Sequence, residues 1–259
     1  SSDSSVNAGD GNILSGSQRS FVGAGQSNSL VSSSDSAIVA GSTNEVRSST
    51  RSLIGVGDDN LIITSDSSIL MGGKTNEIGN STSSSLVGGF SNNITGTESS
   101  IVGGSNNLIV GNRSSLVGGL SNVISGDLSV LVGGSNNEVV GDAIVIVGGQ
   151  DNFVSGALTT VFAGRDNRIS GEASTVVAGQ SNYIKLSDNS AVVAGTGNFI
   201  ENSERSFVGA GSDNEFNNSF DSAIVGGASN DIEGSNSSSI SAGTGNFIQD
   251  SQNSFLAGG

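Results

Sequence analysis

SSLVGGLSNVISGDL, at residues 114–128, is the stretch that decides the fold. Residues 114–117 and 122–125 form two short strand-like stretches of period two, and each stretch ends at a glycine-containing turn. A period of two is typical of β-strands, whereas the glycine density and the β-branched residues exclude a helix. We therefore expect each such unit to form two short strands separated by tight turns.

The same unit recurs along the whole chain. Its most regular feature is a Gly-Gly, Ala-Gly or Val-Gly pair that recurs every 16 or 15 residues. The second residue of each pair is called the anchor here. The anchors are Gly9, Gly25, Gly41, Gly57, Gly73, Gly89, Gly104, Gly119, Gly134, Gly149, Gly164, Gly179, Gly195, Gly211, Gly227, Gly243 and Gly259. Identical columns at a constant spacing indicate rungs that stack about 4.8 Å apart and pair their backbones in parallel. The sequence predicts an all-β, parallel β-solenoid or β-roll of about 17 rungs, one repeat domain over residues 1–259 and a segment of a longer chain.

Two columns of large apolar residues predict the core. One lies three residues before each anchor, as Ile38 does, and the other lies five residues after it, as Leu30 does. A serine stands five residues before 15 of the 17 anchors, on the same face as the first column. We interpret this serine column as a buried ladder of hydroxyl groups that bond to neighbouring backbone rather than as catalytic nucleophiles.

An asparagine stands three residues after each of the first sixteen anchors. These residues are Asn12, Asn28, Asn44, Asn60, Asn76, Asn92, Asn107, Asn122, Asn137, Asn152, Asn167, Asn182, Asn198, Asn214, Asn230 and Asn246. The column can be interpreted as a set of ligands, but stacked carboxamides can also donate and accept hydrogen bonds from rung to rung. We favour this structural ladder, and asparagine also tolerates the left-handed backbone that such turns demand.

The six 15-residue rungs share a glycine seven residues after the anchor. It stands at Gly96, Gly111, Gly126, Gly141, Gly156 and Gly171, whereas only two of the ten longer rungs carry one there. Because glycine adopts positive φ at no steric cost, we expect it to turn the chain with one residue fewer.

The outward positions of the first strand are unexpectedly apolar. Two residues before the anchor, apolar side chains follow one another over eight rungs, and the position four residues before the anchor compensates in volume: Phe21 accompanies Gly23. A packed interface would hold the summed volume near constant, whereas a freely solvated face would have no reason to. We therefore favour a face buried between subunits over a solvent-exposed or ligand-binding face. The predicted subunit interface comprises Val39, Val87, Val102, Val117, Val132, Val147, Phe162, Val177, Val193, Val225, Phe21, Phe207 and Phe255.

The outward positions of the second strand are mixed, with charged residues such as Glu45 and Arg168 among aromatic residues such as Phe153 and Tyr183. At any single position we favour an ordinary solvated outer wall. If the protein recognises a partner, this variable face is where recognition would reside.

Composition excludes several kinds of chemistry. The chain has no His and no Cys, so the usual general base, the usual nucleophile systems and thiolate metal sites are missing. With 9 Lys and Arg against 24 Asp and Glu, the net charge of −15 argues against nucleic acid as a partner, and no apolar run is long enough to insert into a membrane. We expect a protein that is not an enzyme and has no catalytic residue, no cofactor and no metal site.

Two stretches resemble a known family. Ser99-Ser100-Ile101-Val102-Gly103-Gly104-Ser105-Asn106-Asn107 and Ser114-Ser115-Leu116-Val117-Gly118-Gly119-Leu120-Ser121-Asn122 are similar to the head repeats of trimeric autotransporter adhesins, the YadA-like heads. The resemblance implies a left-handed β-roll in which three chains pack side by side on a cell surface and bind extracellular-matrix or host-surface molecules. A viral or algal surface fibre fits the same repeat.

The sequence therefore predicts a structural or adhesive fibre segment, extracellular or on a cell or virion surface, that forms a homo-oligomer, with a trimer expected. An ice-binding or ice-nucleating solenoid is the alternative, although such surfaces use regular Thr rows and here only Thr160 and Thr175 stand in adjacent rungs. A tailspike that cleaves carbohydrate would need paired carboxylates in a cleft, and no acidic pair repeats in that way.

Overall fold

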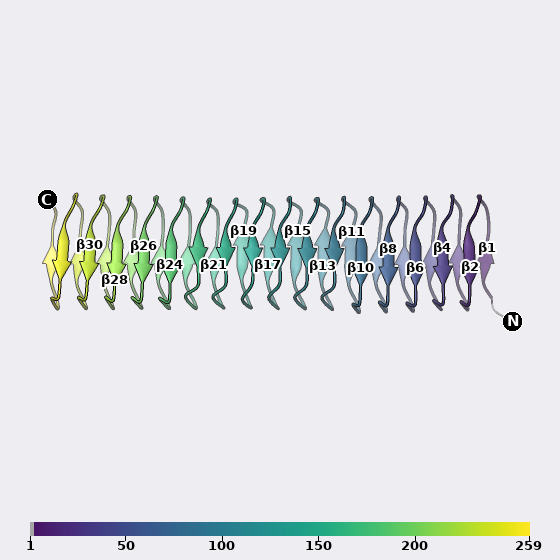
Figure 1. The fold of residues 1–259 in the computed structure, drawn as a ribbon, viewed down its shortest axis with the longest axis horizontal. Helices are drawn as coiled ribbons and strands as arrows, with labels where there is room; N and C mark the ends of the chain where they lie inside the picture. Colours follow the sequence, from purple (N-terminus) through teal and green to yellow (C-terminus); the bar gives the residue numbers. More distant parts are fainter. Residues whose placement is uncertain (1–2) are drawn as a thin grey trace. The chain divides into compact units, whose positions relative to one another are not determined.

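The computed structural model describes residues 3–259, and the chain divides into two compact units, Ser1–Gly133 and Gly134–Gly259. Among the described residues there is no helix, and every strand pairing is parallel. The predicted all-β parallel solenoid is therefore confirmed. In each unit, odd-numbered strands form one sheet and even-numbered strands form another, and Figure 1 shows how the strands follow one another rung by rung.

The first unit holds β1 to β17. Its odd-numbered strands are β1 (Ser5–Val6), β3 (Phe21–Val22), β5 (Ala37–Ile38), β7 (Leu53–Ile54), β9 (Ile69–Leu70), β11 (Ser85–Val87), β13 (Ser100–Val102), β15 (Ser115–Val117) and β17 (Val130–Val132). Its even-numbered strands are β2 (Ile13–Ser15), β4 (Ser29–Val31), β6 (Glu45–Arg47), β8 (Leu61–Ile63), β10 (Glu77–Gly79), β12 (Asn93–Ile94), β14 (Leu108–Ile109) and β16 (Val123–Ile124).

The second unit holds β18 to β33. Its even-numbered strands are β18 (Glu138–Val139), β20 (Phe153–Val154), β22 (Arg168–Ile169), β24 (Tyr183–Lys185), β26 (Phe199–Glu201), β28 (Glu215–Asn217), β30 (Asp231–Glu233) and β32 (Phe247–Gln249). Its odd-numbered strands are β19 (Val145–Val147), β21 (Thr160–Val161), β23 (Thr175–Val176), β25 (Ala191–Val192), β27 (Phe207–Val208), β29 (Ala223–Ile224), β31 (Ser239–Ile240) and β33 (Phe255–Leu256).

The core of each rung is built from the two predicted apolar columns. Ile38 from β5 and Val46 from β6 belong to one rung, and both side chains are fully buried. Identical columns lie in register, so that Ile38 pairs with Ile54 and Val46 with Ile62 on the neighbouring rung. Each aliphatic side chain therefore packs against its own kind above and below, which fills the narrow interior continuously.

The turns between these strands depend on left-handed residues other than glycine. In the rung that begins at Gly41, Thr43, Ser48 and Arg51 have φ of 57°, 50° and 53°. Their N–H groups donate back to the preceding rung, as Thr43 does to Gln26 O over 2.9 Å, whereas strand residues donate forward. Left-handed backbone costs energy for these residue types, and hydrogen bonds between the stacked rungs offset that cost.

Two details of the turns differ from the sequence-based expectation. The left-handed residue is the one before the conserved asparagine, as Thr43 (φ 57°) is before Asn44, and the asparagine itself is not among the residues with positive φ. The glycine of the short rungs is also not left-handed. A Cβ at Gly96 or Gly111 would overlap the carbonyl oxygen of the next rung. Glycine is therefore required there because a Cβ would not fit between the rungs, and not because of the φ angle.

Candidate interaction surfaces

The asparagine column forms a continuous ladder inside each unit. Asn60 donates its side-chain amide to Asn44 Oδ1 at 3.0 Å and to Gly73 O at 2.9 Å, and its own Oδ1 accepts the main-chain N–H of Asn76 at 3.1 Å. Asn60 is 1 % exposed. A side chain that is buried and has its hydrogen bonds satisfied inside the protein is not available to a ligand, so the ladder is part of the fold.

The predicted serine column is buried and bonded to backbone, as expected. Ser52 Oγ donates to Ser65 O at 2.8 Å and accepts the N–H of Ser68 at 3.4 Å. These hydroxyls are held by the neighbouring rung.

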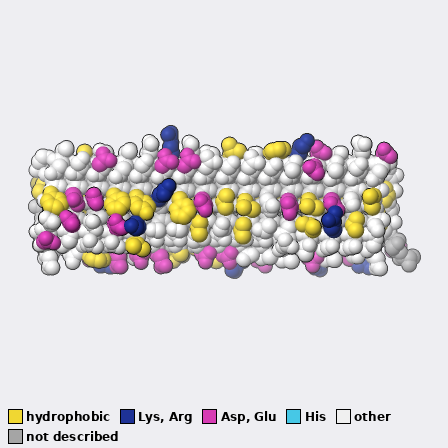
Figure 2. Space-filling model, viewed as in Figure 1, with side chains coloured by type: hydrophobic (Ala, Val, Ile, Leu, Met, Phe, Trp, Pro, Cys, Tyr) yellow, Lys and Arg dark blue, Asp and Glu magenta, His cyan; other side chains and the backbone are white. Residues whose placement is uncertain are grey.

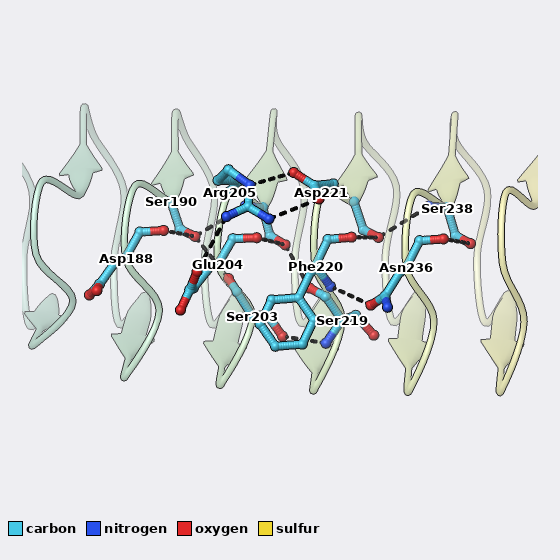
Figure 3. A network of polar contacts seen from close by, with 12 residues as sticks. Asp188, Ser190, Ser203, Glu204, Arg205, Ser219, Phe220, Asp221, Asn236 and Ser238 are labelled. Atoms are coloured by element: carbon cyan, nitrogen blue, oxygen red, sulfur yellow. Dashed lines mark hydrogen bonds and ion pairs between the residues drawn. The ribbon is translucent and has the colours of Figure 1, made fainter.

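A second buried serine column was not predicted from the sequence. It lies eight residues after the anchor in all ten longer rungs, at Ser17, Ser33, Ser49, Ser65, Ser81, Ser187, Ser203, Ser219, Ser235 and Ser251. Ser49 Oγ accepts the N–H of Ser65 at 2.9 Å, and in the second unit Ser203 and Ser219 pair in the same way, as Figure 3 shows. The signal was present in the sequence, because counting forward from each anchor of a longer rung always reaches Ser. In the short rungs, the glycine seven residues after the anchor stands in place of this serine.

The same corner carries exposed charge pairs that run from rung to rung. In Figure 3, the guanidinium of Arg205 meets the carboxylate of Asp221 through two contacts, with Nε to Oδ1 at 2.6 Å and Nη2 to Oδ2 at 2.9 Å. Hydrogen bonding to Arg205 holds the pKa of the Asp221 carboxyl below its ordinary value. Both side chains are about half exposed, so the pair aligns the corner and adds little to stability.

The outer wall formed by the odd-numbered strands carries no charge. We call it the uncharged wall, and it consists of the positions four and two residues before each anchor. In the first unit these are Ser5, Asn7, Phe21, Gly23, Ala37, Val39, Leu53, Gly55, Ile69, Met71, Ser85, Val87, Ser100, Val102, Ser115, Val117, Val130 and Val132. In the second unit they are Val145, Val147, Thr160, Phe162, Thr175, Val177, Ala191, Val193, Phe207, Gly209, Ala223, Val225, Ser239, Ser241, Phe255 and Ala257.

The outer wall formed by the even-numbered strands is different. We call it the mixed wall, and it consists of the positions four and six residues after each anchor. Ten of its 32 residues are charged, seven of them in the second unit, whereas none of the 34 residues of the uncharged wall is. Figure 2 shows hydrophobic, acidic and basic side chains interspersed along the mixed wall. Because the chain has 33 charged residues, their complete absence from one wall indicates a surface under a constraint that the other wall does not share.

The residues predicted as a subunit interface all lie on the uncharged wall. Val102 is 47 % exposed and Phe162 is 51 % exposed, and Phe21 is the half-buried member of the set. Each unit presents consecutive rungs with an apolar residue two positions before the anchor: Met71, Val87, Val102, Val117 and Val132 in the first unit, and Val147, Phe162, Val177 and Val193 in the second. Each run of apolar residues is thus accessible to another molecule.

Two leucines extend the uncharged wall around its corner. Leu128 and Leu158 have φ of 58° and 57° and are 52 % and 66 % exposed. Leucine is poorly suited both to left-handed backbone and to solvent, and equivalent corners elsewhere use Asp35 or Asn189. Both leucines thus add exposed apolar surface beside the uncharged wall.

An ice-binding surface would need regular rows of Thr, but on the uncharged wall Thr residues stand side by side in one pair of rungs only. Thr160 and Thr175 lie in register on β21 and β23, but the flanking strands place Val145 and Ala191 at the same position.

Other chemistry is sparse in the described part of the chain. No group of three or more Asp or Glu side chains in residues 3–259 comes together as a metal site. Nor does that range contain a helix long and apolar enough to cross a membrane. On the mixed wall, Asp231 Oδ1 is buried without a hydrogen-bond partner. Burial, with the charges of Glu215 and Glu233, raises the pKa of Asp231 to about 6.

Comparison with known proteins gives no family. No protein-family model and no curated protein matches the chain. A solved structure described as a putative acetyltransferase from Desulfovibrio desulfuricans G20 aligns over 95 % of this chain and 69 % of its own, with 8 % sequence identity and a TM-score of 0.20. A score that low carries no argument about activity. The chain is a β-solenoid repeat protein.

Proposed function

We propose that the chain is a non-enzymatic, extracellular segment of a structural or adhesive fibre. Copies associate through the uncharged wall, with three copies expected from the resemblance to adhesin heads. The mixed wall then faces the surroundings and provides the surface for attachment.

The observation that carries this proposal is the absence of charge from the uncharged wall. Copies of a chain with a net charge of −15 repel one another, and they can pack closely only through a surface that brings no like charges together. The uncharged wall meets that condition in both units, and 22 of its 34 residues are apolar. Contiguous exposed apolar surface of this kind is typical of protein interfaces.

Sedimentation equilibrium of the purified chain tests the proposal. The expected mass is three times the 25.6 kDa of one chain at micromolar concentration, and added salt is expected to strengthen association because it screens the repulsion between the acidic copies. A stable, soluble monomer would refute self-association, and a stable dimer would refute the threefold arrangement.

A further inference from the structure

The mixed wall of the second unit has two adjoining shallow depressions that share one side chain, Arg168. One is lined by Asp166, Ser181 and Tyr183 together with Arg168. The other is lined by Asn136, Glu138, Asp151 and Phe153 together with Arg168. Together they form a shallow groove that crosses several rungs, called the Arg168 groove here.

Aromatic residues stand on both sides of Arg168 in the same column of the mixed wall. Phe153, Arg168, Tyr183 and Phe199 lie in register on consecutive strands, so each is about one rung, or about 4.8 Å, from the next. The rings of Tyr183 and Phe199 contact each other, with centroids 5.3 Å apart and planes inclined by 34°. The groove therefore offers flat apolar surface on both sides of a guanidinium group.

The polar groups of the groove are of both signs. Arg168 takes part in no ion pair among residues 3–259, so its donors are free to meet a ligand. Glu138, Asp151 and Asp166 supply acceptors around it. A cationic ligand would meet Arg168, and an anionic ligand would meet three carboxylates, so either would place like charges together.

We propose that the Arg168 groove binds an uncharged, extended polysaccharide that runs along the rungs. A sugar ring has an apolar face, which stacks on Phe153 and Tyr183, and a rim of hydroxyl groups that both donate and accept. The hydroxyls donate to Asp151 and Asp166 and accept from Arg168. Phe153 and Tyr183 are two rungs, about 10 Å, apart, which is close to the repeat of two hexose units in an extended β-1,4-linked chain.

The chain contains its own probe for this groove. Tyr183 is the only Tyr and there is no Trp, so intrinsic tyrosine fluorescence reports on the groove alone. Cellohexaose and hexa-N-acetylchitohexaose, two uncharged β-1,4-linked hexasaccharides, are titrated into the full chain. We expect a saturable change in Tyr183 emission with at least one of them.

Variants locate the binding. Phe153→Ser and Arg168→Ser change exposed wall residues and are expected to weaken binding by about tenfold each. Phe247→Ser is the matched control, because Phe247 is an exposed aromatic residue of the same column, away from the groove, and its loss leaves binding unchanged. No saturable change with either sugar at millimolar concentration would overturn the inference, as would equal weakening by Phe247→Ser. Binding of an arginine-rich peptide instead of the sugars would overturn the ligand class.

This inference rests on the proposed role in attachment but not on self-association, and the two fail separately. A monomeric chain that binds the hexasaccharide would refute the fibre interface and retain the groove. A trimer that binds neither sugar would retain the interface and refute the groove.

Discussion

The side-chain amide of Asn107 donates to the main-chain carbonyl of Gly119 in the next rung over 3.1 Å, and also to Asn92 Oδ1 in the preceding rung over 3.0 Å. One buried carboxamide thus joins three rungs. Its Oδ1 in turn accepts the N–H of Asn122, so removing it leaves partners on both sides without a hydrogen bond.

Asn107→Ser is therefore expected to lower the free energy of unfolding by about 3 kcal/mol, because several buried polar groups lose their partners together. Urea unfolding followed by circular dichroism measures the effect. The adjacent Asn106→Ser is the control: Asn106 is exposed, and the equivalent Ser91 and Ser121 adopt the same left-handed φ. Similar losses from the two substitutions would contradict the ladder.

Substitutions at two neighbouring glycines distinguish the stability cost of a positive φ from the cost of a steric overlap between rungs. Gly88 has φ of 71° with open space where a Cβ would lie, whereas Gly89 has φ of 98° and its Cβ would overlap Gly104 O and the amide of Asn92. Gly88→Ala is expected to cost about 1–2 kcal/mol of unfolding free energy from φ alone. Gly89→Ala is expected to cost about 3 kcal/mol or more, because neighbouring rungs must separate. Equal costs in the same urea assay would refute the role of close rung spacing.

The core of the solenoid was predictable because its columns never vary in character. Ile38 and Leu30 belong to columns that stay apolar in every rung, and period-two alternation assigns them to the interior. Backbone conformation was less predictable. Left-handed residues include Thr43, Arg51 and Leu158, types that seldom adopt positive φ, because the stacked rungs impose the turn whatever the local preference.

The candidate surfaces were only partly predictable. The apolar run on the odd-numbered strands could be read from single columns such as that of Val102. The Arg168 groove combines residues from several rungs, among them Asp151, Arg168 and Tyr183, so its lining emerges only when neighbouring rungs are seen together.

A charge on the uncharged wall is expected to prevent association without unfolding the chain. Val102→Asp places a carboxylate on each copy at the proposed contact, where burying it or pairing it with its own equivalent is unfavourable. The association constant should fall roughly a hundredfold.

Leu108→Asp is the control, because its position on the mixed wall holds Glu45 and Glu77 in other rungs of the same unit. Sedimentation measures the mass, and circular dichroism checks the fold. Retention of the wild-type mass by Val102→Asp would exclude this wall as the interface.

Asp231 should make the second unit more stable in mild acid. Burial beside Glu215 and Glu233 raises the pKa of Asp231 to about 6, against about 3.9 for an ordinary Asp. Between these values the folded chain holds a proton that the unfolded chain has lost. This contribution to stability is therefore present in full below about pH 4, declines as pH rises through 6, and is absent above it.

Asp231→Asn removes the charge permanently. We expect the variant to exceed the wild type by about 1 kcal/mol at pH 7.5, allowing for screening by solvent, and to match it near pH 4. Urea unfolding at both pH values measures the difference. Asp213→Asn removes an exposed charge from the same unit and serves as the control. A gain from Asp231→Asn that is the same at both pH values would show that the Asp231 carboxyl does not titrate in this range.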